Sequence, residues 1–419
     1  MSTAYPATPL PVKSHSSCPK ISDCPESSGP QARLSGGPRI ATPGLDALKI
    51  NFWVDFSNSA LLAHLEAAKL KAQSDDVDSE PIALGGYEFN CMRSGTHLFS
   101  FRLERGDIRV LLSRRPHTTN IQNCRLEIGS LSCWIPGYNQ AYQEFIEMIE
   151  FLGGVFTKEL LSECHLCADY VGLDIGSAPV ADQNYWVTRA KKYSVYYESR
   201  NLTGVDIGKG GKLMLRVYDK IREIKTHSRH KIDTFLFLWG IGDIDCTPVT
   251  RFEFQVKRKA LHQFRIEGKD APIKTLVDLN TSLSSLWAYL TTEWVRLTAA
   301  PVDRKNKHQT RVASHEYWTE LMNADFAGSI PVFRRTGSSL CDLPSLKLQM
   351  AGIGMTIAAA LGQSKDDVES IITFSQDAIE GTIRGLSRNK IDFTKRMARK
   401  INRVVPFRDA QSQETEEIG

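Results

Sequence analysis

Long apolar runs, cysteines and a marked excess of one charge are all scarce in this chain of 419 residues. Its longest apolar stretches, 235–242 and 351–362, fall well short of the roughly 18 residues that span a bilayer, so we predict no membrane partner. The 9 cysteines are unevenly spaced, and the first residues lack the layout of a secretory signal. These absences exclude a disulfide scaffold and favour a reducing cytoplasm as the location.

The overall charge indicates no particular partner, because 52 basic residues nearly balance 48 acidic ones, for a net charge of +4. The distribution is less even. Basic residues concentrate between Arg384 and Arg403, where Asp392 is the single acidic residue, and again between Lys209 and Lys231. Either cluster could hold a polyanion such as a nucleic acid, or could simply be the solvated face of a helix or strand.

Composition and hydrophobic periodicity divide the chain into four parts. Residues 1–43, rich in Ser, Pro, Gly, Thr and Ala, predict a disordered tail. Between 44 and 265, short strand patterns recur around helical stretches, which predicts an α+β domain with an antiparallel sheet and leaves room for a duplicated unit. Residues 266–408 have longer Leu- and Ala-rich helical patterns, and 409–419 predict a second tail.

The stretch from Lys212 to Lys220 carries the strongest chemical signal. With the two-residue period of a strand, Arg216, Tyr218 and Lys220 point to one side, and apolar residues point to the other. A tyrosine between two cations favours the ionised phenolate, because neighbouring positive charge lowers a pKa that is ordinarily about 10. The alternative is a strand tyrosine whose ring packs against long basic side chains.

Carboxylates recur on predicted strands. Glu253 lies on the polar face of the stretch 250–258, Glu127 lies between apolar neighbours, and Asp169 and Asp174 punctuate an apolar strand. Carboxylates on adjacent strands are suited to Mg²⁺ or Mn²⁺, which prefer oxygen ligands and keep sites open for substrate phosphate. Each of them could equally be a solvated strand charge.

Two weaker patterns suggest other chemistry. Cys164 and Cys167 have the spacing of half a zinc site, but no suitable second pair is near, so we expect buried small side chains. His262 and Arg265 have a spacing seen in tyrosine recombinases, with Tyr289 downstream as a nominal nucleophile. Chance readily supplies such a short pattern.

Two stretches resemble the trans-acting replication initiators of small rolling-circle plasmids and filamentous phages. One is Arg216-Val217-Tyr218-Asp219-Lys220 after the glycine-rich turn 208–211, and the other is Arg-Phe-Glu-Phe-Gln-Val-Lys-Arg at 251–258. Shorter stretches near Gly44 and Asp169 are similar to the first strand and the acidic strand of that family. The resemblance covers residues 44–265, and it implies a nuclease-like core that nicks one strand of a DNA origin.

The resemblance also implies roles for individual residues. Tyr218 would attack a phosphodiester, forming a 5′-phosphotyrosine and a free 3′-hydroxyl, while Arg216 and Lys220 hold the phosphate. Since the chain has no His-hydrophobe-His triplet, carboxylates would hold the Mg²⁺ or Mn²⁺ ion. The expected metal ligands are Glu127, Asp169, Glu253 and Asp174. Expected DNA contacts are Arg251, Lys257, Arg258, Arg388, Lys395, Arg396, Arg399 and Lys400.

The implied partners are origin DNA, both duplex and single-stranded, and the helicase and polymerase of a bacterial host, in whose cytoplasm the protein would act. No P-loop is present, so strand separation would fall to the host helicase. A homodimer is among the assemblies allowed. Two alternatives stay open: a non-catalytic DNA-binding regulator of replication, and a tyrosine recombinase, which would need no metal.

Overall fold

The computed structural model describes residues 38–405, apart from gaps at 57–59, 118–119, 269–270, 304–308, 335–338, 341–342, 363–366, 389, 391–392, 395–396 and 398–403. Most of the two predicted tails therefore lies outside the described residues. The first described strand begins at Arg39. Residues 39–43 thus belong to a sheet and not to the tail that the sequence predicted.

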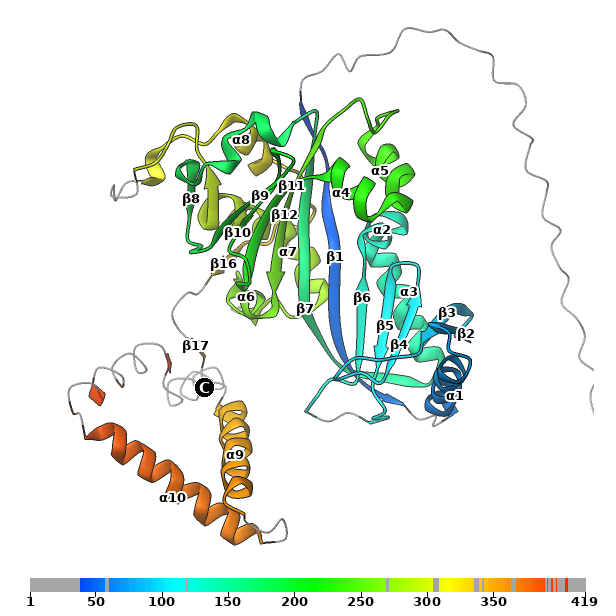
Figure 1. Ribbon diagram of the computed structural model, residues 1–419, viewed down its shortest axis with the longest axis vertical. Coiled ribbons are helices and arrows are strands. Elements are labelled where there is room, and N and C mark those ends of the chain that lie inside the picture. The colour runs from blue at the N-terminus through cyan, green and yellow to red at the C-terminus, as the bar shows by residue number, and fades with distance from the viewer. Residues whose placement is uncertain are drawn as a thin grey trace, which may run out of the picture. The chain divides into compact units, whose positions relative to one another are not determined.

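The fold is built around two strands of 18 residues each, β1 (Arg39–Phe56) and β7 (Gly154–Val171), which pair antiparallel. Beyond β1 the sheet continues with β2 (Ser79–Leu84), β3 (Tyr87–Met92), β4 (Phe101–Arg105), β5 (Ile108–Leu112) and β6 (Cys124–Ile128). Beyond β7 it continues with β9 (Tyr193–Glu198), β10 (Asn201–Ile207), β11 (Leu213–Asp219) and β12 (Val249–Lys257). This sheet of 11 strands (Figure 1), together with the helices, confirms the α+β class.

The strand order is nearly symmetric about the central β1–β7 pair, since it runs β2-β3-β4-β5-β6-β1-β7-β12-β11-β10-β9, with β2 as one extra strand at the edge of the first half. In each half a long strand leads into shorter ones, and the last of these, β6 or β12, returns to pair with the long strand. A duplicated unit would produce this arrangement. The duplication itself stays a prediction.

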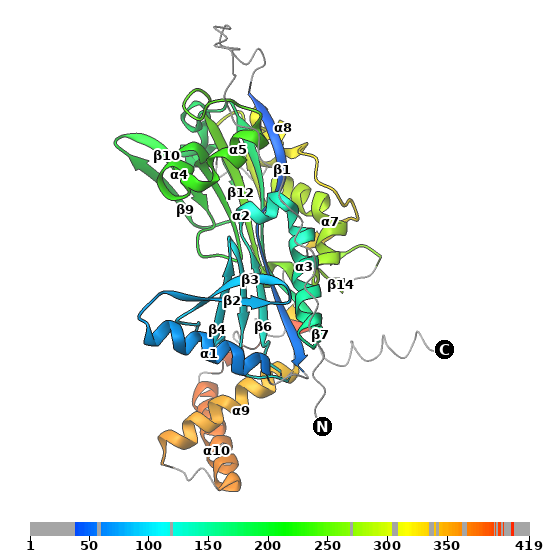
Figure 2. The ribbon, with the colours of Figure 1, turned by 90° about the vertical axis from the view of Figure 1, so that its right-hand side faces the viewer.

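The sheet has one apolar and one polar face in its centre, because apolar and polar residues alternate along the strands. Two helices cover the apolar face, α3 (Tyr138–Phe151) and α7 (Leu276–Tyr289), and Figure 2 shows them on the same side of the sheet. Phe52 of β1 lies with its ring 5.0 Å from that of Phe145 on α3. Phe254 of β12 lies 5.2 Å from Trp287 on α7. These aromatic contacts anchor both halves of the sheet to their helices.

Two short helices that the sequence did not predict pack on the polar face, α4 (Lys220–His227) and α5 (Ile232–Trp239). Asp219 starts α4 directly after β11 by accepting a hydrogen bond from the backbone N–H of Arg222. Gly240 ends α5 in the left-handed conformation, which glycine adopts without steric cost. The chain thus turns back toward β12 over the polar face.

The C-terminal part is less purely helical than predicted. Besides α7 it contains α8 (Glu316–Met322), α9 (Leu343–Ala360) and α10 (Val368–Ser387). It also contains the short strands β13 (Phe264–Ile266), β14 (Ala271–Pro272), β15 (Val295–Leu297) and β16 (Val332–Arg334). Helices α9 and α10 contact each other. No helix in the described part of the chain has the length and apolar content needed to cross a bilayer.

Candidate active site

Tyr218 lies on the polar face of β11, in the strand phase that the sequence predicted. Its hydroxyl donates a hydrogen bond to Oε2 of Glu253, at 2.8 Å. Glu253 comes from the neighbouring strand β12, where it lies opposite Arg216. Its side chain is almost entirely buried. The fold therefore pairs the predicted nucleophile with one carboxylate of the predicted metal set.

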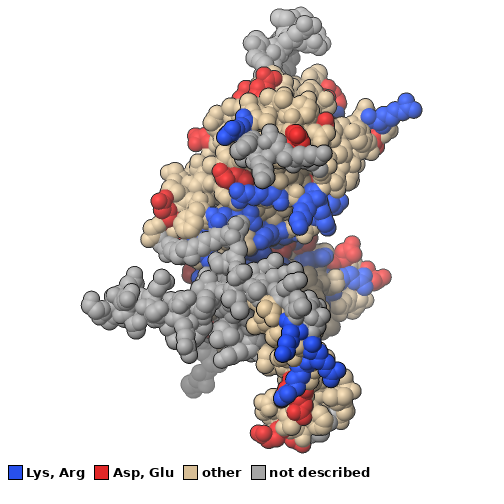
Figure 3. All heavy atoms as spheres, turned by 90° about the vertical axis from the view of Figure 1, so that its left-hand side faces the viewer, with Lys and Arg blue, Asp and Glu red and all other residues tan. Residues whose placement is uncertain are grey.

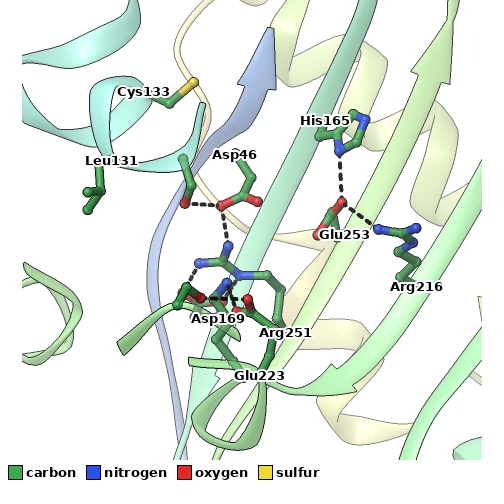
Figure 4. Close-up of polar contacts among 12 residues, drawn as sticks. Asp46, Leu131, Cys133, His165, Asp169, Arg216, Glu223, Arg251 and Glu253 are labelled. Atoms are coloured by element: carbon green, nitrogen blue, oxygen red, sulfur yellow. Dashed lines mark hydrogen bonds and ion pairs between the residues drawn. The ribbon is translucent and has the colours of Figure 1, made fainter. Parts of the chain in front are cut away.

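Glu253 is held by two further groups (Figure 4). Nδ1 of His165, from β7, lies 2.8 Å from Oε1 of Glu253, and Nη1 of Arg216 lies 3.8 Å from the same oxygen. The other ring nitrogen of His165 contacts Glu163 at 3.0 Å, and Lys49 donates to Glu163 at 2.9 Å. A line of alternating charges thus crosses β1, β7 and β12 and ends at Tyr218.

The charge state of Tyr218 differs from the prediction. Burial raises the pKa of its phenol well above 10, and the nearby Glu253 carboxylate raises it further, outweighing the lowering effect of Arg251. Nζ of Lys220 lies 5.6 Å from the centre of the Tyr218 ring, but it pairs with Glu223 at 2.6 Å. The expected tyrosinate is therefore wrong, and the phenol is neutral with a carboxylate as its hydrogen-bond acceptor.

Glu253 is the group that is ionised. Burial by itself would raise the pKa of this carboxyl, but the hydrogen bond from His165 and the charges of His165 and Arg216 hold it below the usual value. A carboxylate within hydrogen-bond reach of a phenol is a candidate general base. The geometry therefore replaces activation of the tyrosine by cations with proton transfer to Glu253.

Arg251 organises a second cluster beside this pair (Figure 4). Its Nε and Nη2 donate to the two carboxylate oxygens of Asp169 at 2.6 and 2.7 Å, and Nη1 pairs with Asp46. Nε1 of Trp239 on α5 also donates to Asp169, at 2.8 Å. Arg251 is 0% exposed, so it offers no surface to DNA. We reassign Arg251 and Asp169 from DNA and metal contact to positioning the polar face.

The remaining predicted ligands lie elsewhere. Glu127 lies on β6 opposite Lys49 of β1, with an oxygen 3.5 Å from Nη1 of Arg125. Asp174 caps a short turn by accepting a hydrogen bond from the backbone N–H of Gly176 at 2.6 Å. Among the described residues, no group of three or more His, Cys, Asp or Glu side chains is placed to bind one metal ion. The four predicted carboxylates therefore do not meet.

Tyr218 and Glu253 open onto a cavity of about 540 Å³, here called the tyrosine pocket. The other polar side chains that line it come from both halves of the chain and include Asp46, Ser130, His165, Tyr196, Asp206, Arg216, Lys220, Glu223 and Lys231. Sequence reasoning missed His165, although it shares the strand phase of Asp169. It also missed Asp46, which no periodic pattern could reveal, because β1 is irregular between Leu45 and Ala47.

The weaker sequence patterns have structural explanations. Cys164 and Cys167 are buried and free, as expected for small core side chains. Arg265 is buried and donates to the backbone carbonyl of His262 at 2.5 Å. The Tyr289 ring packs edge-on against Phe264, with 5.0 Å between ring centres. The Tyr289 hydroxyl accepts hydrogen bonds from Nη1 of Arg189 and from Nη1 of Arg334, each at 3.5 Å.

The structure describes only some of the residues that were predicted to contact DNA. Arg258 is exposed at the start of α6 (Arg258–Leu261), Lys257 is half-buried, and Arg388 is exposed at the end of α10. Lys395, Arg396, Arg399 and Lys400 lie outside the described residues. A cavity of about 370 Å³ at the predicted glycine-rich turn, here called the basic pocket, is lined by Trp294 and by Arg189, Lys191, Lys192, Lys209, Lys212 and Arg334. Figure 3 shows Lys and Arg gathered on this side of the molecule.

His165 predicts a measurable pH dependence of stability. Burial would lower its pKa, but the hydrogen bonds to Glu163 and Glu253 raise it to about 9. Since the folded pKa exceeds the unfolded value of about 6.5, the stabilisation is complete below that value and is lost as pH rises through about 9. We expect His165→Gln to lower the free energy of unfolding by up to about 3 kcal/mol near pH 6 and by little near pH 10.

Urea unfolding at both pH values measures the difference. His64→Gln, an exposed histidine on α1 (Ala60–Ser74), is the matched control and should change neither value. An equal loss for His165→Gln at both pH values would contradict a charged bridge between the two carboxylates.

Comparisons with known proteins leave the chain without an assigned family. No family model matches it, and no curated protein matches it significantly. The function is therefore argued from the pocket itself.

Proposed function

We propose that this protein is a rolling-circle replication initiator that nicks one strand of origin DNA through Tyr218. The observation that carries the proposal is the 2.8 Å hydrogen bond from the Tyr218 hydroxyl to the buried Glu253 carboxylate, at the wall of a cavity. Nucleophile and base within hydrogen-bond reach, with the base held by a third group, here His165, is the arrangement that covalent catalysis requires. The resemblance described above supplies the substrate class.

In the proposed chemical step, Tyr218 replaces the 3′-oxygen on phosphorus. Tyr218 Oη forms a bond to phosphorus while its proton passes to Oε2 of Glu253. The bond from phosphorus to the 3′-oxygen breaks, and that oxygen takes a proton from solvent. The products are a 5′-phosphotyrosine and a 3′-hydroxyl that a host polymerase can extend, and the covalent link retains the bond energy for rejoining. Arg216, which is exposed beside the pair, would hold the phosphate.

The proposal includes a divalent ion, but with other ligands than the four carboxylates that the sequence predicted. Asp46 and Glu253 line the same pocket, and the charge of Asp46 opposes ionisation of Glu253. Because both oxygens of Glu253 already contact Tyr218 and His165, Asp46 and the substrate phosphate would be the groups that hold an Mg²⁺ ion, and a cation there would offset this repulsion. When bound, it would polarise the phosphate as a Lewis acid.

The DNA strand would reach the tyrosine pocket across a positively charged surface. The basic pocket offers six cations, while the Trp294 ring at its floor is buried. Cations neutralise the phosphates of a DNA strand with release of counterions. Arg258 and Arg388 add exposed positive charge elsewhere.

The test is incubation of the protein with labelled supercoiled DNA of its own replicon, in Mg²⁺ or EDTA, followed by peptide mapping of any tyrosine linked to DNA. We expect an adduct on Tyr218 in Mg²⁺ and none in EDTA. An adduct on Tyr289 that ignores EDTA would establish the recombinase alternative. Tight DNA binding without any adduct would establish the non-catalytic regulator.

A further inference from the structure

A second polar pocket lies on the sheet in the N-terminal half of the chain. This cavity of about 430 Å³, here called the arginine pocket, is lined by Thr96, His97, Leu98, Phe99, Arg102, Arg109, Leu111, Arg125 and Glu127. Its residues come from β4, β5 and β6 and from the loop before β4. The proposed nicking reaction uses none of them.

The strands of the arginine pocket pair in a definite register. Arg109 of β5 lies opposite Glu127 of β6, and Leu111 lies opposite Arg125. Next to β6 is the long strand β1, where Asn51 lies opposite Arg125. The adjacent strands β5, β6 and β1 thus present polar side chains side by side, except at Leu111.

The tyrosine pocket has the same register in the C-terminal half. Arg216 of β11 lies opposite Glu253 of β12, and Tyr218 lies opposite Arg251. Next to β12 is the long strand β7, where Asp169 lies opposite Arg251. Since β5-β6-β1 and β11-β12-β7 hold matching places on either side of the sheet centre, the two pockets occupy corresponding places.

The local sequences correspond as well. Arg109-Val110-Leu111 matches Arg216-Val217-Tyr218, and Arg125-Leu126-Glu127 matches Arg251-Phe252-Glu253. Each match falls on strands that hold the same position in the two halves. Leu111 therefore occupies the place of the proposed nucleophile.

Side-chain contacts repeat too. Nε of Arg125 donates to Oδ1 of Asn51 at 2.7 Å, and the guanidinium lies 5.1 Å from the centre of the Phe99 ring. The corresponding values for Arg251 are 2.6 Å to Oδ1 of Asp169 and 5.0 Å to the Phe235 ring. The two rings come from different places, since Phe99 precedes β4 and Phe235 lies on α5 between β11 and β12. Agreement in register, in sequence and in the arginine hydrogen bond indicates two copies of one unit.

The differences between the copies decide what the arginine pocket can do. Leucine replaces the attacking phenol, so the transfer step proposed for Tyr218 has no counterpart at Leu111. Arg102 stands opposite Leu111, where the C-terminal half has Gly204 opposite Tyr218. The lining carries three arginines that share two carboxylates, since Arg125 pairs with Glu127 at 3.5 Å and Glu104 of β4 pairs with Arg102 at 3.4 Å and with Arg109 at 3.0 Å.

We propose that the arginine pocket is a non-cleaving copy of the tyrosine pocket that binds a phosphodiester group of single-stranded DNA. The proposal rests on the proposed function for the identity of the strand. Five strand spacings, about 24 Å along the sheet, separate β5 from β11. A strand attached at Tyr218 could therefore be held a second time by the same molecule, and guanidinium groups are suited to that contact.

The test measures binding of a fluorescein-labelled oligothymidylate by anisotropy, over a series of salt concentrations. All proteins carry Tyr218→Phe, so that no covalent step contributes. Arg109→Ala is compared with Arg93→Ala, because both remove a partly exposed arginine with one short ion pair, to Glu104 and to Asp76 respectively. We expect Arg109→Ala to weaken binding about tenfold, as for a hydrogen bond to a charged group. The dependence of log K on log salt should become shallower by about 0.7.

Nicking is measured separately on the wild-type protein. Equal affinities and salt slopes for the two variants, where the wild-type protein forms the Tyr218 adduct, would overturn this inference and leave the proposed function standing. A selective loss for Arg109→Ala, where the wild-type protein forms no adduct, would support the arginine pocket and overturn the proposed function. Loss of binding in both variants alike would show a general surface effect and count against a specific pocket.

Discussion

Tyr218→Phe is expected to abolish nicking while binding of single-stranded origin DNA stays within about twofold. The change removes one oxygen atom, and with it the bond that would form to phosphorus, but keeps the ring against Lys220. Since the rest of a catalytic site cannot replace a missing nucleophile, no adduct should form. Supercoil relaxation and a denaturing gel for protein-linked DNA measure the loss, and anisotropy measures the binding.

The matched control is Tyr196→Phe. Tyr196 lies on β9 and lines the same pocket, but its hydroxyl donates to Asp206 at 2.8 Å and not to Glu253. This variant should still nick. Residual nicking by Tyr218→Phe, with an adduct on another tyrosine, would remove Tyr218 from the mechanism. Loss of activity in both variants would show that the pocket tolerates no phenylalanine.

Glu253→Gln is expected to lower the nicking rate by about 10²- to 10⁴-fold, the usual contribution of a general base. Glutamine keeps the size of the side chain and can still accept the hydrogen bond from Tyr218, but it cannot take up the proton. The ionised Glu253 of the wild-type protein makes its rate insensitive to pH around neutrality, because its pKa lies below the usual value. In the variant the rate should rise with pH, since the phenol must ionise by itself.

Glu163→Gln separates base catalysis from loss of the charge network. Glu163 contacts His165 just as Glu253 does, but it does not contact Tyr218. Its replacement should leave the pH profile of nicking flat. If Glu253→Gln kept both a flat pH profile and the wild-type nicking rate, Glu253 would be excluded as the base. If Glu253→Gln and Glu163→Gln lowered the nicking rate equally, the charge of His165 would be the cause instead.

The alternation of polar and apolar residues along single strands was enough to predict on which face the central residues of the site lie. The two-residue period places Arg216 and Tyr218 on one face of β11 and Glu253 on the polar face of β12, whatever the rest of the fold does. The same reasoning correctly assigned the apolar faces of these strands to the core. Composition likewise predicted an α+β class with an antiparallel sheet. These features depend on neighbours in sequence, so sequence alone determines them.

Only the tertiary structure decided which side chains on different strands contact one another. Tyr218 meets Glu253 because β11 pairs with β12 in one particular register, and Asp169 is unavailable to a metal because Arg251 occupies both of its oxygens. Glu127 has the phase and residue type of a ligand but belongs to the other half of the sheet. Asp46 enters the pocket through an irregularity of β1. Phase is a local property of a strand, whereas register, burial and pairing of charges depend on residues far apart in the chain.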